Sequence, residues 1–126
     1  MESQSLHNQE LVLHILGQLV QACDLIITWN EGIASEDDYL CSPTGMEKMA
    51  ATCMLLESIG ESAKKIDRLI PGFLTENEPA IPWKQIKGLR DHIAHGYFEL
   101  DAVTIFETTK EIQELKEALI RLQSCI

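Results

Sequence analysis

Apolar residues recur at helical spacing in two long segments of the chain. Residues 6–29 place Leu, Val, Ile and Cys at intervals of three and four, which puts them on one face of a helix. A second apolar stripe runs up to Ile70. Ser42 and Pro43 mark its start as N-cap and first helical residue, and Pro71 follows its end. The pattern predicts two long helices.

Two further helices are predicted in the second half of the chain. Residues 71–82 hold three of the four prolines and are expected to form a loop. A third helix should begin at Pro82 and end near Gly96. Asp101 is the expected cap of a fourth helix that ends near Gln123. We therefore predict an all-α fold, an antiparallel four-helix bundle with short extra helical turns in its loops.

Length and composition support a single domain over residues 1–126. Hydrophobic residues make up 45% of the chain and aromatic residues only 6%, so Leu, Ile, Val, Ala and Met must build the core. The four cysteines have no metal-site spacing, and we expect them to be reduced and packed as small hydrophobes. The first residues lack the pattern of a signal peptide, and no apolar run approaches the roughly 20 residues that span a membrane. We expect a cytoplasmic protein with no membrane association.

Gly60 lies in the middle of the second predicted helix. Glycine costs about 1 kcal/mol relative to alanine at such a position. The sequence therefore predicts that another helix approaches closely at Gly60.

Charge is distributed unevenly along the chain. The net charge is −10, which argues against broad, nonspecific nucleic-acid binding. The stretch from Lys84 to His95, however, contains Lys84, Lys87 and Arg90 against a single acid, Asp91. This stretch is either a solvated helix face or a site for an anion.

Residues 90–97, RDHIAHGY, combine groups that suit phosphate chemistry. Arginine binds phosphate oxygens with two N–H groups, and histidine exchanges protons near neutral pH. Together they could cleave RNA without a metal, by activating the ribose 2′-OH and stabilising the charged transition state. In a straight helix, however, Arg90 and His95 would point roughly 140° apart. Either the helix unwinds near Gly96, or two subunits share the site.

Several residues of this stretch have structural alternatives. Asp91 could pair with Lys87 one helical turn away, and His92 could be a solvated residue that complements the helix dipole. Asp91, His92 and His95 could bind a metal, but no fourth ligand suggests itself, so we expect neither a metal nor a cofactor. Tyr97 could simply pack under the loop.

The chain resembles the HepT-like branch of the HEPN superfamily, the ribonuclease toxins of HepT–MntA toxin–antitoxin pairs. The segments that carry the resemblance are LLESIGESAKKI (55–66), IPWKQIKGLRDHIAHGYFELD (81–101) and ELKEAL (114–119). Arginine, four residues, histidine, one residue and tyrosine look like the family signature. The resemblance covers roughly residues 5–123.

The resemblance implies a helical bundle that forms a homodimer, with the motifs of two chains facing one cleft. It implies a metal-independent endoribonuclease toxin of a type VII module that cleaves tRNA or mRNA. Arg90 would polarise the scissile phosphate, His95 would transfer protons or stabilise charge, and Asp91 would orient the site. The implied partner is an MntA-like nucleotidyltransferase antitoxin that neutralises the toxin by transferring AMP onto Tyr97.

An alternative is a noncatalytic HEPN binding module that forms a complex with a nucleotidyltransferase. The acidic net charge favours this alternative, whereas the intact set of Arg90, His95 and Tyr97 favours the enzyme. In the enzyme, Lys84 and Lys87 are the expected ligands for RNA phosphates.

Overall fold

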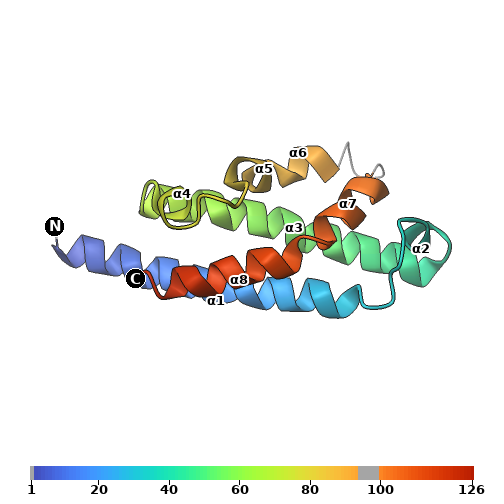
Figure 1. Ribbon diagram of the computed structural model, residues 1–126, viewed down its shortest axis with the longest axis horizontal. Helices are drawn as coiled ribbons and strands as arrows, with labels where there is room; N and C mark the ends of the chain where they lie inside the picture. The colour runs from blue at the N-terminus through green and yellow to red at the C-terminus, as the bar shows by residue number, and fades with distance from the viewer. Residues whose placement is uncertain (1, 94–99) are drawn as a thin grey trace.

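The structure, a computed structural model, describes residues 2–93 and 100–126. Most of these residues lie in helices, and no strand element occurs among them, so the prediction of an all-α fold is confirmed (Figure 1). The helices are α1 (Glu2–Trp29), α2 (Asp37–Leu40), α3 (Pro43–Leu69), α4 (Phe73–Asn77), α5 (Trp83–Lys87), α6 (Leu89–Ile93), α7 (Ala102–Thr109) and α8 (Ile112–Gln123).

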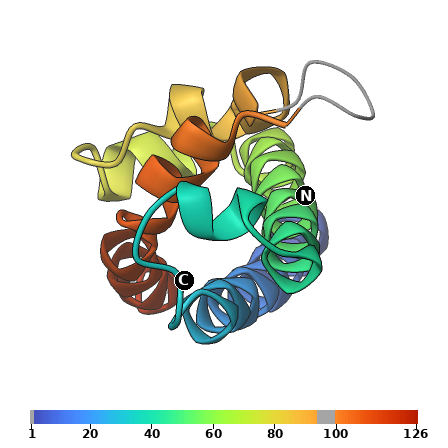
Figure 2. The ribbon, with the colours of Figure 1, turned by 90° about the vertical axis from the view of Figure 1, so that its right-hand side faces the viewer.

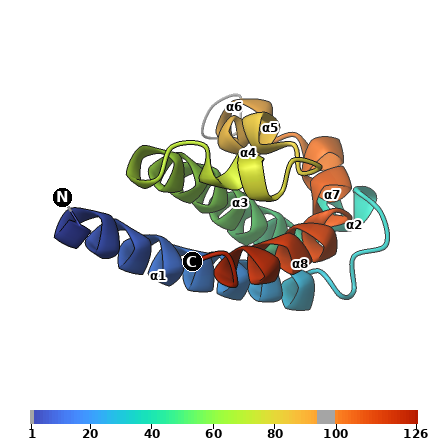
Figure 3. The ribbon, with the colours of Figure 1, turned by 60° about the vertical axis from the view of Figure 1, so that its left-hand side comes forward.

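The chain runs back and forth along one long axis. It follows α1 in one direction, returns along α3, runs forward again through α5 and α6, and returns through α7 and α8 (Figure 1). Helix α1 packs against both α3 and α8, while α5 and α6 pack on α3. Viewed along the axis, α2 lies across one end of the bundle (Figure 2). Figure 3 shows α5 and α6 on the side of α3 that faces away from α1. The four antiparallel runs match the predicted bundle.

The start and end of α3 follow from local signals in the sequence. The Ser42 side chain accepts a hydrogen bond from the backbone N–H of Gly45 at 3.0 Å, and Pro43 is the first helical residue, as predicted. After α3, Gly72 adopts a left-handed conformation with φ of 82°. This turn leads into α4, which buries Phe73 and Leu74. The expected loop therefore contains one of the short helical turns that were anticipated.

The third and fourth predicted helices are each interrupted. Gly88 separates α5 from α6. Its backbone N–H donates a hydrogen bond to the Gln85 carbonyl, one turn back, at 3.1 Å. Between α7 and α8, the hydroxyls of Thr108 and Thr109 donate to the carbonyls of Thr104 and Phe106 at 2.7 and 2.6 Å. Such local hydrogen bonds compete with a continuing helix. The apolar periodicity runs across both breaks, which is why it predicted single helices.

Gly60 brings α3 and α5 into close contact, as predicted. A Cβ atom at this position would lie 2.6 Å from the backbone oxygen of Ile86. That distance is too short for any side chain, so only glycine allows this approach. Since α5 leads directly into α6, Gly60 also determines how α6 sits on the bundle.

A polar cluster joins α1, α2 and α3 inside the bundle. The Asn30 amide donates to the Ile26 carbonyl at 2.8 Å and to the Thr52 hydroxyl at 2.9 Å. The Tyr39 hydroxyl donates to the Asn30 side-chain oxygen at 2.5 Å. Thr52 and Tyr39 are fully buried. Because each partner satisfies the other, this cluster does not leave a buried polar group without a hydrogen bond.

Helix α8 is tied to its neighbours by two ion pairs. Arg121 donates two hydrogen bonds to the Glu78 carboxylate, at 2.7 and 3.0 Å. These hydrogen bonds hold the pKa of Glu78 below its ordinary value. Lys116 pairs with Asp24 of α1 at 2.6 Å.

The cysteines divide into two classes. Cys23 and Cys53 are buried, whereas Cys41 and Cys125 are exposed. Burial raises the pKa of Cys23 to about 12 and that of Cys53 to about 11. The expectation that the cysteines pack as small hydrophobes is confirmed for the buried pair and wrong for the exposed pair.

Helix α1 is long and apolar enough to cross a membrane, judged by length and composition alone. Its most apolar 18-residue window has a mean hydropathy of 1.7, and 33% of that window is buried. The expectation that the chain has no such segment is therefore wrong on this criterion. Core helices of globular proteins have the same composition, and in this bundle one face of α1 packs on α3 and α8.

Candidate active site

Arg90 and Asp91 lie on the exposed face of α6. The helix is anchored by Leu89 and Ile93, which are four residues apart and buried on the opposite face. Within the described turn, the three residues between these anchors, including His92, face solvent. The guanidinium of Arg90 is therefore placed where a phosphate could reach it.

The structure describes α6 from Leu89 to Ile93, so the divergence of Arg90 and His95 that the sequence raised stays a prediction. The predictions for His95 and Tyr97 fall on residues 94–99, outside the residues that the structure describes.

Two residues, one on either side of residues 94–99, are joined by a backbone hydrogen bond. The backbone N–H of Asp101 donates to the Ile93 carbonyl at 2.9 Å. The Asp101 carboxylate caps α7 by accepting from the N–H and hydroxyl of Thr104 at 3.0 and 2.7 Å, so the predicted cap is confirmed. The end of α6, next to Arg90, therefore lies beside the start of α7.

Helix α5 is fixed on the bundle before the chain enters α6. The Trp83 ring is buried, and its indole N–H donates to the Glu78 carbonyl at 2.9 Å. The backbone of Ile86 lies against Gly60 of α3. These contacts give α6 a well-supported base, which a site that must position a charged group requires.

The two lysines of this region have different environments. Lys84 is exposed on α5. Lys87 forms an ion pair with Asp67 of α3, and both side chains are about one quarter exposed. Lys87 therefore pairs with Asp67 and not with Asp91, and a large part of its charge is already compensated. Of the two candidate phosphate ligands, Lys84 is the one that faces solvent without this restraint.

The proposed metal alternative gains no support from the described residues. Among residues 2–93 and 100–126, no group of three or more His, Cys, Asp or Glu side chains is arranged to hold a metal ion. That alternative also required His95, which lies outside these ranges.

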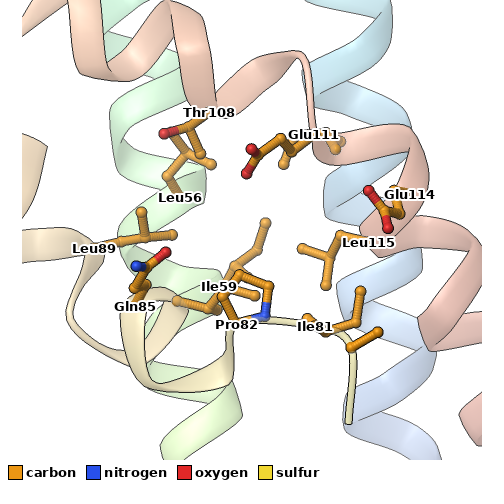
Figure 4. Close-up of a pocket in the computed structure, with 13 residues that line it drawn as sticks. Leu56, Ile59, Ile81, Pro82, Gln85, Leu89, Thr108, Glu111, Glu114 and Leu115 are labelled. Carbon is orange, nitrogen blue, oxygen red and sulfur yellow. The ribbon is translucent and has the colours of Figure 1, made fainter. Parts of the chain in front are cut away.

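An apolar cavity of about 290 Å³ lies behind α6, and sequence reasoning missed it. Leu89 lines this cavity together with residues of α3 and α8, as Figure 4 shows. Two carboxylates, Glu111 and Glu114, also line it. In the sequence these two residues are indistinguishable from surface charges on an acidic helix, so no pattern signals that they border a cavity.

Known proteins with similar sequences assign the family. Residues 19–122 match the family described as ribonuclease HepT-like. The chain is 32% identical over 109 residues to a "probable ribonuclease HepT" of Thermococcus cleftensis, a match that covers 86% of the chain and 92% of the relative. It is 34% identical over 103 residues to a "putative RNase" of Caldanaerobacter subterraneus, covering 81% of the chain and 85% of the relative. The chain therefore belongs to the HepT-like ribonuclease family.

Two further relatives match a shorter stretch of the chain at higher identity. A "putative RNase" of Methanocaldococcus jannaschii is 44% identical over 68 residues, which is 53% of the chain and 55% of the relative. A second relative from the same organism matches at 44% over 68 residues, or 53% of its length. The chain thus matches about half the length of these two proteins. No solved structure shows significant similarity to the chain.

Proposed function

We propose that this protein is a metal-independent endoribonuclease, the toxin of a HepT–MntA-like toxin–antitoxin module, acting in the cytoplasm on tRNA or mRNA. The observation that carries the proposal is the exposed Arg90 on a firmly seated helix, in a chain that belongs to a ribonuclease family. Names of relatives support the same activity, since those quoted above are described as RNases or ribonucleases.

In this mechanism Arg90 binds the scissile phosphate and stabilises the charge that develops on it. His95 accepts the 2′-OH proton or stabilises the transition state, and Asp91 orients the site. Lys84 adds attraction for the RNA backbone. Ion pairing with Asp67 leaves Lys87 a smaller role in RNA binding than its charge alone would give.

The proposed site is completed by a second copy of the chain. A homodimer would place two motifs in one cleft and so concentrate positive charge there. The protein is otherwise acidic, with a net charge of −10 per chain. RNA would therefore be attracted to the cleft and repelled elsewhere, which favours a narrow range of substrates.

Control of the toxin is proposed to act at Tyr97. An MntA-like nucleotidyltransferase would transfer AMP from a nucleoside triphosphate to the tyrosine hydroxyl, with pyrophosphate as the leaving group. The added phosphodiester would bring negative charge into an anion-binding cleft. RNA binding would then be opposed by both charge and bulk.

Cleavage of labelled total tRNA in EDTA, by protein expressed without any partner, tests the activity. We expect cleavage by the wild type and its loss in Arg90→Ala and His95→Ala, with the oligomeric state unchanged. His92→Ala and Arg68→Ala are matched controls, because both residues are exposed and lie outside the proposed set. Equal loss in the controls would contradict the assigned roles.

The noncatalytic binding module is the second candidate, and the acidic net charge favours it. If wild-type protein with an unmodified Tyr97, verified by mass spectrometry, cleaves neither tRNA nor mRNA, the endoribonuclease proposal is wrong. Stable complex formation with a nucleotidyltransferase would then support the binding module.

A further inference from the structure

The cavity behind α6 has an apolar floor. Leu56 and Ile59 of α3, Leu89 of α6 and Leu115 of α8 line it, and its volume of about 290 Å³ is close to the lower end of the range for small-molecule sites. Figure 4 shows these side chains converging on an open centre. The floor suits an aliphatic group and offers nothing to a phosphate.

The polar side chains that line the cavity are Thr108, Glu111, Glu114 and Gln85, and all but the Gln85 amide, which also carries N–H donors, offer hydrogen-bond acceptors. The Glu111 carboxylate reaches over the cavity from the start of α8, and the Glu114 carboxylate lies at its edge near Leu115 (Figure 4). The Thr108 hydroxyl also lines the cavity and donates its proton to the Thr104 carbonyl at 2.7 Å, so its oxygen is left as an acceptor. A ligand that satisfies these groups must carry several N–H donors and a positive charge.

The cations of α8 and the residues before it form their ion pairs with other carboxylates, and Glu114 is a minor contributor to the raised pKa of Arg121. Lys110 pairs with Glu107 at 3.1 Å and lies over the Phe106 ring, Lys116 pairs with Asp24, and Arg121 binds Glu78. Among the residues that the structure describes, neither carboxylate at the mouth has an ion-pair partner. The two carboxylates are therefore available to pair with positive charge from a ligand.

We propose that this cavity binds a small aliphatic cation, an alkylamine or alkylguanidine. Its hydrocarbon stem lies along Leu56, Ile59 and Leu115, and its charged head is held by Glu111 and Glu114. The cavity favours a free small molecule over the side chain of a docked protein. None of the large apolar side chains that are exposed in the described residues belongs to the lining, so the cavity has no apolar rim for a macromolecule to cover.

Occupancy of the cavity has a direct route to the proposed active site. Leu89 forms part of the cavity wall, and the next residue is Arg90, on the opposite, exposed face of the same helical turn. A ligand that packs against Leu89 therefore contacts the helix that carries the phosphate-binding guanidinium. The site for the cation and the site for RNA are separate, with opposite charge preferences.

Titration with agmatine and cadaverine, followed by isothermal calorimetry and by backbone amide NMR shifts, tests the proposal. We expect saturable binding, with the largest shifts at Gln85, Leu89, Arg90 and Leu115. The double variant Glu111→Gln/Glu114→Gln should bind about tenfold or more weakly, because two charge-assisted contacts are lost. Both side chains are exposed, and the Glu111 side chain makes no capping hydrogen bond, so this variant should fold normally.

The control variant Glu47→Gln/Glu117→Gln makes the same change in net charge at exposed positions outside the cavity. It should bind the amines as the wild type does. Equal weakening in both double variants would show only general attraction to an acidic protein and would overturn the proposal. So would the absence of saturable binding, or binding of n-pentanol as strong as that of cadaverine. Because the readout is binding, its failure leaves the ribonuclease proposal untouched.

Discussion

Replacing Gly60 with alanine should destabilise the protein, although alanine is the better helix former. The new Cβ would lie 2.6 Å from the Ile86 carbonyl oxygen, about 0.8 Å inside the 3.4 Å at which ordinary contact begins. The atom it meets is backbone, so α5 must shift as a unit. Overpacking of this kind costs roughly 1–3 kcal/mol, against a gain of about 1 kcal/mol in helix propensity. We expect a net loss of about 1 kcal/mol.

Gly17→Ala is the matched control for this prediction. Gly17 also lies within a long helix, but a Cβ atom there would meet nothing within 4 Å. The control should therefore gain about 1 kcal/mol of stability, and the two variants should differ by about 2 kcal/mol. Urea unfolding followed by circular dichroism, at one fixed protein concentration, measures both. Equal stabilisation by the two substitutions would refute the close approach of α5 to Gly60.

Three further outcomes follow from the ion pairs and the thiols. Lys87→Met should cost on the order of 1 kcal/mol in urea unfolding by leaving the half-buried Asp67 carboxylate without its partner, and adding Asp67→Asn should restore most of that loss. Cys23 and Cys53, with pKa values raised to about 12 and 11, should stay protonated and react slowly with Ellman's reagent. The two exposed thiols should react at once. Rapid reaction of all four thiols would contradict the buried positions of Cys23 and Cys53. The Arg121 hydrogen bonds that lower the pKa of Glu78 should stabilise the folded protein at pH values above 4.5, the ordinary pKa of this group. This stability should be lost as the pH falls through the lowered pKa. Glu78→Gln should therefore show a smaller drop in Tm on acidification than the wild type.

The features predicted correctly from sequence are those that a few neighbouring residues decide. Ser42 and Asp101 were identified as caps because side-chain oxygens at these positions reach backbone N–H groups of the next turn. Gly60 was identified because its cost within a helix requires a reason. The breaks at Gly88 and at Thr108–Thr109 were missed, since apolar spacing continues across them and only competing hydrogen bonds reveal them.

The sequence predicted which types of residue form the candidate site, but it did not predict which residues contact one another there. The sequence located Arg90 in a basic stretch, and the structure places it on the exposed face of α6. It suggested Asp91 as a partner for Lys87, whereas the structure pairs Lys87 with Asp67 of another helix. Pairing between distant segments depends on how the helices pack, and a single sequence does not specify that packing. The cavity bordered by Glu111 and Glu114 escaped notice for the same reason.

The contact between Asn30 and Thr52 has a consequence for how uniquely the bundle folds. The remaining buried contacts between α1 and α3 are largely apolar, and apolar side chains tolerate a slip of one helix past another by a turn. The half-buried Asn30 amide does not, since a slip would move it away from the Thr52 hydroxyl and leave that buried hydroxyl without the Asn30 N–H. Together with the hydrogen bond from the Asn8 amide to the Leu69 carbonyl at 3.1 Å, this contact therefore favours one register of α3 against α1. Replacing Asn30 and Thr52 together with apolar residues should keep the protein folded but allow several registers, seen as multiple or broadened NMR signals. Gly60 would then no longer pack against α5 in one fixed position, and Arg90 on the following helix would no longer have one fixed position either.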